Sequence, residues 1–189
     1  MITICYRRPS AFSGSHEMAA YFKHGSYALI LFLESHSVIT VGKLGAFDFP
    51  MGWYTYVGSA FGPGGLAGRL KHHLNPDGPS HWHIDYLRRR AAVREFWICG
   101  QRNKREHDWA SAFEHLSGVS IAVKGFGSSD CHCPSHLFRS QQFPSFEEFR
   151  RSIHEKFPRD SKISRYEVLG ETGEPFQAQK HLWESKQVR

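Results

Sequence analysis

The run Gly25-Ser-Tyr-Ala-Leu-Ile-Leu-Phe-Leu33 sets the architecture that the sequence predicts. It is rich in strand-forming side chains and apolar on both alternating sets of positions, which is typical of a strand at the centre of a sheet. Ser37–Val41, Trp53–Val57 and Val93–Cys99 predict three more strands. Gly45–Gly52, which contains Pro50, predicts a loop because its glycine and proline residues favour turns.

Helices are predicted between and after these strands. Leu66, Leu70 and Leu74 are four residues apart, so they form one apolar stripe on a helix that opens after the turn Gly62–Gly65 and ends at Asn75–Gly78. Further helices are expected from Ser80, over 105–116 and over 143–157. Strands followed by helices, with one more strand between them, predict an α/β or α+β fold in which a small mixed β-sheet is flanked by helices.

The chain of 189 residues fits one ordinary domain with a short appendage at either end. We assign residues 25–158 to this domain, and 40% of the chain is hydrophobic, which is enough to form a core. Residues 1–24 are interpreted as an N-terminal arm with a short helix around Glu17–Phe22, and residues 159–189 as a polar C-terminal extension.

Composition favours a soluble, cytoplasmic protein with an anionic partner. The net charge is +6 and the pI is about 9.3, a balance attracted by the phosphates of nucleic acid or by an acidic membrane surface. No run approaches 18 apolar residues and the N-terminus lacks secretory-signal features, so a membrane-spanning or secreted protein is not expected. The four cysteines are expected to be reduced thiols.

Two tyrosines on predicted strands are candidates for catalysis. Tyr27 follows Gly25 by two residues, and Tyr56 precedes Gly58 by two residues. A tyrosine hydroxyl both donates and accepts hydrogen bonds, so it can help to activate water or hold a phosphate oxygen. Each tyrosine taken alone is also explained as a half-buried aromatic side chain of a strand.

Charged residues on two predicted helices add further candidates. Arg69 and His73 are four residues apart and project from one helical face, where they could stabilise a phosphate in transfer and assist proton transfer. Lys71, His72 and His73 are also explained together as a basic helix end. Glu106 begins a later helix, where a carboxylate can hold a hard divalent cation or compensate the helix dipole.

Two short segments carry clusters of possible metal ligands. His81, His83 and Asp85 are two apart, a spacing that does not place three ligands on one helical face, so a structural hydrogen-bond cluster around Asp85 is expected. The segment Cys131-His-Cys-Pro-Ser-His136 offers zinc ligands at Cys131, Cys133 and His136, without a clear fourth ligand nearby in the sequence. Buried or free thiols are the alternative.

The order of these residues resembles the signature of the GIY-YIG nucleases: Gly25-Ser-Tyr27, Tyr56-Val-Gly58, Arg69 with His73, and a helical Glu106. Four blocks are similar to the stand-alone Uri-type branch, which is named after UvrC and intron-encoded endonucleases: Val41–Gly45, Tyr54–Ala60, His81–Leu87 and Gly125–Phe138. The resemblance covers roughly residues 25–140. This chain departs from the pattern at Ser26, in the wide gap between the two tyrosines, and after Glu106, where the branch usually has Cys and a small helical run.

The resemblance implies the GIY-YIG fold and hydrolysis of DNA phosphodiester bonds by in-line attack of water, leaving 5′-phosphate and 3′-hydroxyl ends. It implies Tyr27 as the general base with help from Tyr56. Arg69, assisted by His73, would stabilise the transition state, and Glu106 would hold Mg²⁺ or Mn²⁺.

Other assignments stay open at this stage. Asp85 or Glu95 is the alternative metal ligand, and Zn²⁺ is an alternative metal. DNA is the expected partner, with RNA not excluded, in DNA repair or processing. A non-catalytic nucleic-acid-binding module and a zinc-stabilised interaction domain are the competing functions. The residues expected to line the nucleic-acid backbone are Lys71, His72, Arg88, Arg89 and Arg90.

Overall fold

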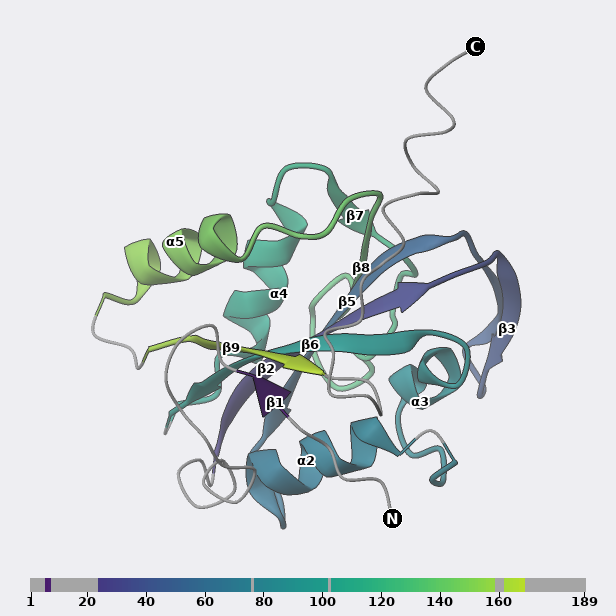
Figure 1. The fold of residues 1–189 in the computed structure, drawn as a ribbon, viewed down its shortest axis with the longest axis horizontal. Coiled ribbons are helices and arrows are strands. Elements are labelled where there is room, and N and C mark those ends of the chain that lie inside the picture. Colours follow the sequence, from purple (N-terminus) through teal and green to yellow (C-terminus); the bar gives the residue numbers. More distant parts are fainter. Residues whose placement is uncertain (1–5, 8–23, 76, 102, 159–161, 169–189) are drawn as a thin grey trace.

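The computed structural model describes residues 6–7, 24–75, 77–101, 103–158 and 162–168 (Figure 1). The helix expected around Glu17–Phe22 lies outside these ranges. In chain order the elements are β1 (Tyr6–Arg7), β2 (Gly25–Leu33), β3 (Ser37–Val41), β4 (Gly45–Phe49), β5 (Gly52–Ala60), α2 (Gly65–Leu74), α3 (His83–Arg88), β6 (Ala92–Gly100), α4 (Glu106–Glu114), β7 (Val119–Ile121), β8 (Leu137–Ser140), α5 (Phe146–Lys156) and β9 (Ser164–Val168).

Strand β2 lies at the centre of a seven-stranded sheet with the order β1-β9-β6-β2-β5-β8-β7. One edge of β2 pairs antiparallel with β5 along its full length, and the other edge pairs antiparallel with β6. Every residue of β2 except Phe32 is buried, as its sequence predicts. Strands β3 and β4 form a separate two-stranded hairpin.

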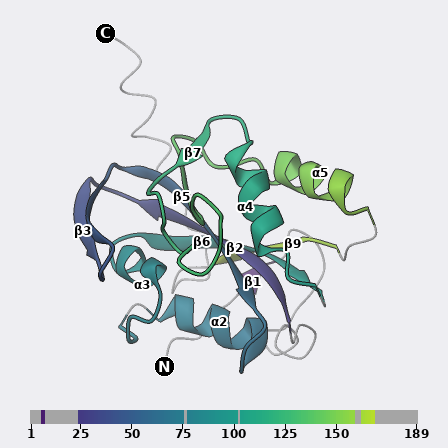
Figure 2. The same cartoon turned by 180° about the vertical axis from the view of Figure 1, so that it is seen from behind.

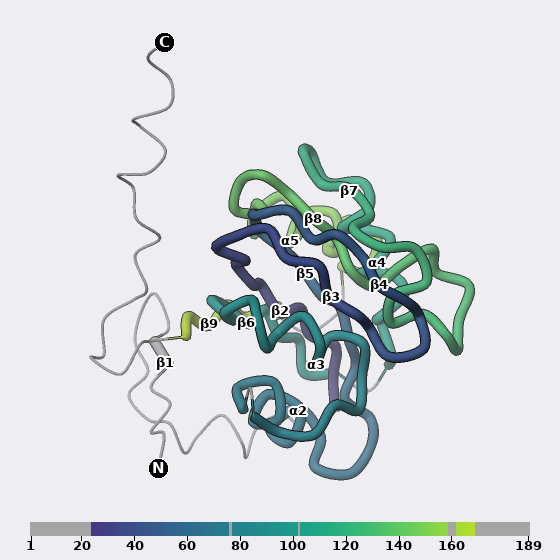
Figure 3. Tube along the Cα trace, turned by 90° about the vertical axis from the view of Figure 1, so that its right-hand side faces the viewer, coloured from purple at the N-terminus to yellow at the C-terminus, as the bar shows by residue number. Residues whose placement is uncertain are grey.

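Two hydrophobic cores lie on opposite faces of the sheet, because successive strand residues point to opposite sides. Leu29 packs in the core that includes Leu70 of α2, together with residues of α3 and of the β3–β4 hairpin. Ile30 packs in the other core, with Phe113 of α4 and Phe149 of α5. Both ribbon views show α2 and α3 on one side and α4 and α5 on the other (Figures 1 and 2). In the side view α2 lies below β6 and β2, whereas α5 lies above them (Figure 3).

The expected α+β class, with a small sheet flanked by helices, is confirmed. Every strand pair among the described residues is antiparallel, whereas the sequence predicted a mixed sheet. The segment Gly45–Gly52 was predicted as a loop, but Gly45–Phe49 pairs with β3. Ser164–Val168, which falls in the predicted polar extension, pairs with β6 and belongs to the sheet. Of the helices that the structure describes, none is long and apolar enough to cross a membrane.

The core between the sheet, α4 and α5 is built from aromatic rings. The ring centroid of Phe149 lies 4.4 Å from that of Phe113 and 4.9 Å from that of Trp109.

We expect Phe149→Ala to lower the free energy of unfolding by about 3–5 kcal/mol, because it leaves a cavity in a closed core. Val38→Ala, at a side chain that is 67% exposed, should change it by less than about 0.5 kcal/mol. Urea denaturation followed by fluorescence measures both, and equal effects of the two substitutions would contradict this packing.

Candidate functional site

Tyr27 and Tyr56 lie on one face of the sheet, on adjacent strands. Tyr27 is opposite Gly58, and Tyr56 is opposite Leu29, so the two tyrosines are diagonal neighbours on the same side. Both side chains are almost fully buried. Gly58 is required at its position, because a Cβ there would lie 2.5 Å from the ring of Tyr27. The two strands therefore bring the predicted tyrosines together, and glycine makes room for one of them.

Helix α2 brings His73 to Tyr27. The helix begins after Gly64, which has a positive φ of 82°, and its residues Leu66 and Leu70 pack into the core below it. A hydrogen bond of 2.9 Å joins the Tyr27 hydroxyl to Nε2 of His73. Burial lowers the pKa of His73 to about 3, so this imidazole is neutral at pH 7.

The two tyrosines are neutral phenols at pH 7. Burial raises the pKa of Tyr27 well above its ordinary value, and the neighbouring Tyr56 raises it further. Burial also raises the pKa of Tyr56; the charge of Glu106 raises it too, whereas the charge of Arg69 lowers it. The Tyr56 hydroxyl therefore lies within electrostatic range of both the predicted metal ligand and the predicted arginine.

Arg69 is held over an aromatic ring. Its guanidinium carbon lies 3.8 Å from the ring centroid of Trp82, which is a cation–π arrangement. Trp82 also contacts the ring of His73, at a centroid separation of 5.9 Å. Within the part of the chain that the structure describes, Arg69 forms no ion pair, so its charge is available to an anionic ligand.

Glu106 begins α4, which packs on the opposite face of the sheet, and it reaches the end of β5. Ser59 of β5 donates a hydrogen bond of 2.6 Å to Oε2 of Glu106, and Lys104 Nζ lies 3.2 Å from the same oxygen. Nδ1 of His136 lies 3.2 Å from Oε1. Burial alone would raise the pKa of Glu106, but His136 and Ser59 outweigh it and lower the pKa to about 2. The carboxylate is therefore ionised across the physiological range.

The segment from Gly125 to His136 connects the two halves of the site. Gly127 has a φ of 72°, and a Cβ at this position would lie 2.9 Å from the ring of Tyr56 and 3.2 Å from Cβ of His136. The backbone N–H of Gly127 donates to Nδ1 of His83 at 3.0 Å. Glycine thus allows this segment to pass closely over Tyr56 and to place His136 beside Glu106.

Three partners of Glu106 were not predicted from the sequence. Ser59 lies in the block around Tyr56, and its position next to that motif was the only signal for it. Lys104 precedes Glu106 by two residues, a spacing without a specific meaning. His136 was considered only as a zinc ligand.

The predicted cluster around Asp85 is confirmed. Asp85 is fully buried and accepts hydrogen bonds from the backbone of His81 and Trp82 and from Arg88, and it is joined to His72 at 2.9 Å. Burial opposes ionisation, but these donors lower the pKa of Asp85 below its ordinary value. The carboxylate fixes the start of α3, and with it the position of Trp82.

The same contacts correct one prediction. The Arg88 side chain is only 1% exposed and is ion-paired with Asp85, so it is not free to line a nucleic-acid backbone. His72 is partly buried against the same carboxylate. Lys71, Arg89 and Arg90 are exposed, as that prediction requires.

Glu95, the other alternative metal ligand, lies on β6 and is occupied elsewhere. Trp97 donates to it at 2.8 Å, and the guanidinium of Arg165 on β9 forms an ion pair with it. The zinc candidates Cys131, Cys133 and His136 do lie together, and His107 of α4 joins them.

A comparison with protein families gives one match. The family described as "Domain of unknown function DUF123" matches residues 26–159, which include all of the site described above. The chain belongs to this family. No match was found among curated proteins or among solved structures.

Because His73 is buried and neutral, we expect this protein to lose stability as the pH falls. The unfolded chain protonates His73 below about pH 6.5, but the folded protein does so only near pH 3. The contribution of neutral His73 to the free energy of unfolding is therefore complete above pH 6.5. It is lost as the pH falls below this value, by up to about 1.4 kcal/mol per pH unit. Between pH 6.5 and 5, we expect the free energy of unfolding to decrease less in His73→Gln than in the wild-type protein. This range lies above the one in which Glu106 titrates.

Urea denaturation at a series of pH values measures this effect. His115→Gln, at an exposed histidine of α4's C-terminal end, serves as the matched control and should keep the wild-type pH dependence. The same slope in wild type and His73→Gln would show that His73 is not the buried neutral base.

Proposed function

We propose that this protein is a divalent-metal-dependent endonuclease that hydrolyses phosphodiester bonds of DNA, on the fold and with the site that the GIY-YIG nucleases share. The observation that carries the proposal is the arrangement around Tyr56. A neutral Tyr27–His73 pair, an arginine without a carboxylate partner among the described residues and an ionised Glu106 meet at one end of β2 and β5. A site that holds and cleaves a phosphodiester needs these three kinds of group.

Tyr27 and His73 supply the route for the proton of the attacking water. The Tyr27 oxygen accepts the water proton while its own proton passes to Nε2 of His73, 2.9 Å away. Because His73 is neutral at pH 7, it has the lone pair for this step. A phosphate bound beside it brings a negative charge, which favours protonated His73 and so strengthens it as the acceptor.

Arg69 acts on the charge of the phosphate. Stacking on Trp82 restricts the guanidinium, so less conformational freedom is lost when it binds an anion. In the transition state the equatorial oxygens gain charge, and an arginine held in place stabilises that charge without reorganisation.

The residues at Glu106 fit a hard divalent cation. The Glu106 carboxylate is ionised and its side chain is 12% exposed, so it can offer one oxygen ligand to Mg²⁺ or Mn²⁺. Such an ion commonly completes its coordination shell with water and phosphate oxygens. Lys104 is a surface cation that a metal could displace, since its side chain is 47% exposed. A metal bound here would neutralise charge on the leaving oxygen.

End-labelled cleavage assays on single-stranded, duplex and flap DNA test this function, with Mg²⁺, Mn²⁺ or EDTA. We expect metal-dependent cutting that falls at least about 100-fold in Arg69→Ala and in Glu106→Gln, because each removes a charge that acts on the transition state. Arg151→Ala and Glu155→Gln, both at exposed positions of α5 on the other face, are the matched controls and should retain activity.

Each outcome decides between functions. Folded Arg69→Ala and Glu106→Gln proteins that cut at the wild-type rate would refute the assigned site. No cutting by the wild-type protein of any substrate, with DNA binding retained, would favour a non-catalytic nucleic-acid-binding module instead.

The exposed cations near α2 and α3 predict the salt dependence of DNA binding. Removing one cation that neutralises a phosphate should reduce the slope of log K against log salt by about 0.9 on duplex DNA. We expect the triple alanine variant of Lys71, Arg89 and Arg90 to bind duplex DNA more weakly with a shallower slope, as measured by fluorescence anisotropy in EDTA. The charge-matched triple variant of Arg150, Arg151 and Lys156 on α5 should bind like wild type. If the two triple variants had the same slope, this surface would not be the DNA-binding face.

A further inference from the structure

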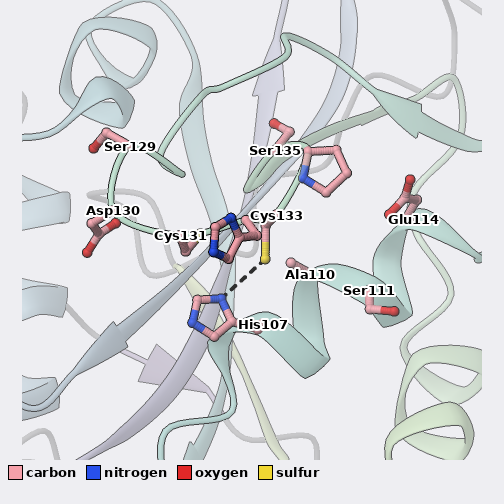
Figure 4. A pocket seen from close by; sticks show the side chains of 11 residues that line it. His107, Ala110, Ser111, Glu114, Ser129, Asp130, Cys131, Cys133 and Ser135 are labelled. Atoms are coloured by element: carbon pink, nitrogen blue, oxygen red, sulfur yellow. Dashed lines mark hydrogen bonds between the residues drawn. The ribbon is translucent and has the colours of Figure 1, made fainter.

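Four soft metal-binding side chains converge beside the site without being used by the proposed cleavage. His107 belongs to the first turn of α4, whereas Cys131, Cys133 and His136 belong to the segment that precedes β8. One ligand atom from each lies within 4.8 Å of all the others. The close view shows His107 directed from α4 toward the thiol of Cys133, at the edge of a surface hollow of about 730 Å³ (Figure 4).

Two of the distances between these atoms are close to those of a tetrahedral centre. Zn–S bonds of about 2.3 Å and Zn–N bonds of about 2.0–2.1 Å, at tetrahedral angles, place sulfur and nitrogen about 3.6 Å apart. Sγ of Cys131 lies 3.5 Å from Nε2 of His136, and Sγ of Cys133 lies 3.2 Å from Nδ1 of His107. The other separations are at most 4.8 Å, so they exceed this value by no more than about 1 Å.

The backbone holds the ligand segment in this position. Two hydrogen bonds of 2.8 Å join the two ends of this loop. Gly125 N–H donates to the Pro134 carbonyl, and His136 N–H donates to the Phe126 carbonyl. The Val57 N–H then donates to the His136 carbonyl, which fixes His136 against the edge of β5. Both cysteines lie in the part of the loop that faces α4. The fourth ligand, His107, comes from this helix, about 25 residues earlier in the chain.

His136 has a carboxylate close to its second ring nitrogen, as metal-bound histidines usually do. Its ring is 1% exposed, with Nε2 toward Cys131 and Nδ1 3.2 Å from Oε1 of Glu106. Histidine ligands usually direct their second ring nitrogen to a carboxylate, which fixes the tautomer and makes the ligand more basic. Glu106 therefore stands behind His136 in the arrangement of an outer carboxylate.

We propose that His107, Cys131, Cys133 and His136 form a structural Zn²⁺ site of the Cys₂His₂ type. Two thiolates and two imidazoles favour zinc over Mg²⁺ or Mn²⁺, which prefer oxygen ligands. Four protein ligands close the coordination sphere, so the ion has a structural role. It joins the loop 125–136 to α4, and through His136 it fixes the orientation of Glu106.

Elemental analysis of the full chain, purified and dialysed under reducing conditions with zinc present, tests the site directly. We expect about one zinc per chain, as a closed four-ligand centre requires. In the cobalt-substituted protein we expect visible bands of a tetrahedral centre and thiolate-to-cobalt charge-transfer absorption. Cys131→Ser should lose the charge-transfer intensity and the stoichiometric metal. His107→Ala, at an exposed position on a helix, should fold and bind zinc more weakly.

Matched variants and a stability measurement separate this site from its surroundings. His132→Ala removes an exposed histidine of the same loop that is outside the ligand set, and it should keep wild-type zinc content. A zinc chelator should lower the midpoint of thermal unfolding of wild type but not of Cys131→Ser.

Reduced protein that retains no zinc, or zinc content unchanged in both Cys131→Ser and His107→Ala, would overturn the assignment. A Cys131–Cys133 disulfide in place of zinc would do the same. None of these measurements uses DNA cleavage, so the zinc site and the nuclease function stand or fall separately.

Discussion

The pairing of β2 along both of its edges is the constraint on which the rest of this structure depends. β2 pairs with β5 over its full length and with β6 over Gly25–Phe32, and its alternate side chains point into two separate cores. This register decides which residues can meet α2. A shift of one residue would turn Tyr27 away from His73 and into the aromatic core under α4 and α5.

The candidate site combines groups from both faces of that sheet. The tyrosines, Arg69 and His73 belong to the face covered by α2, whereas Glu106 comes from the helix on the other face and is met at the end of β5 by Ser59. Burial keeps the tyrosines and His73 neutral, but three polar partners keep Glu106 ionised. Groups that lie close together thus differ in ionisation state because their immediate surroundings differ.

The sequence predicted those parts of the fold that depend on local pattern. The apolar run of β2, the leucine stripe of α2 and the turn that ends it are local signals, and the structure has each of them. Strand β9 was missed because its identity depends on pairing with β6, about 70 residues away, and its polar side chains look like those of an extension. Strand β4 was missed because its glycine and the nearby proline outweighed its alternating pattern.

The site shows the same division between local and distant information. The positions of Tyr27, Tyr56, Arg69, His73 and Glu106 in the chain could be read from motif order, but their partners could not. Burial of Arg88 follows from Asp85, three residues earlier, whose own burial is a tertiary property. His107 could not be recognised as a companion of the cysteines, because only the packing of α4 against the loop brings them together.

The closure of the sheet beside β9 has a consequence for self-association. The edge strand β1 pairs with the last two residues of β9, Glu167 and Val168, so segments from near both ends of the chain meet at the same side of the sheet. On the far side, β7 is only three residues long. Exposed strand edges are templates for pairing with another molecule, and proteins limit them by covering or shortening them. A chain that begins after Arg7 would also leave the Glu167–Val168 end of β9 without its partner, and so extend the edge that can serve as a template for intermolecular strand addition.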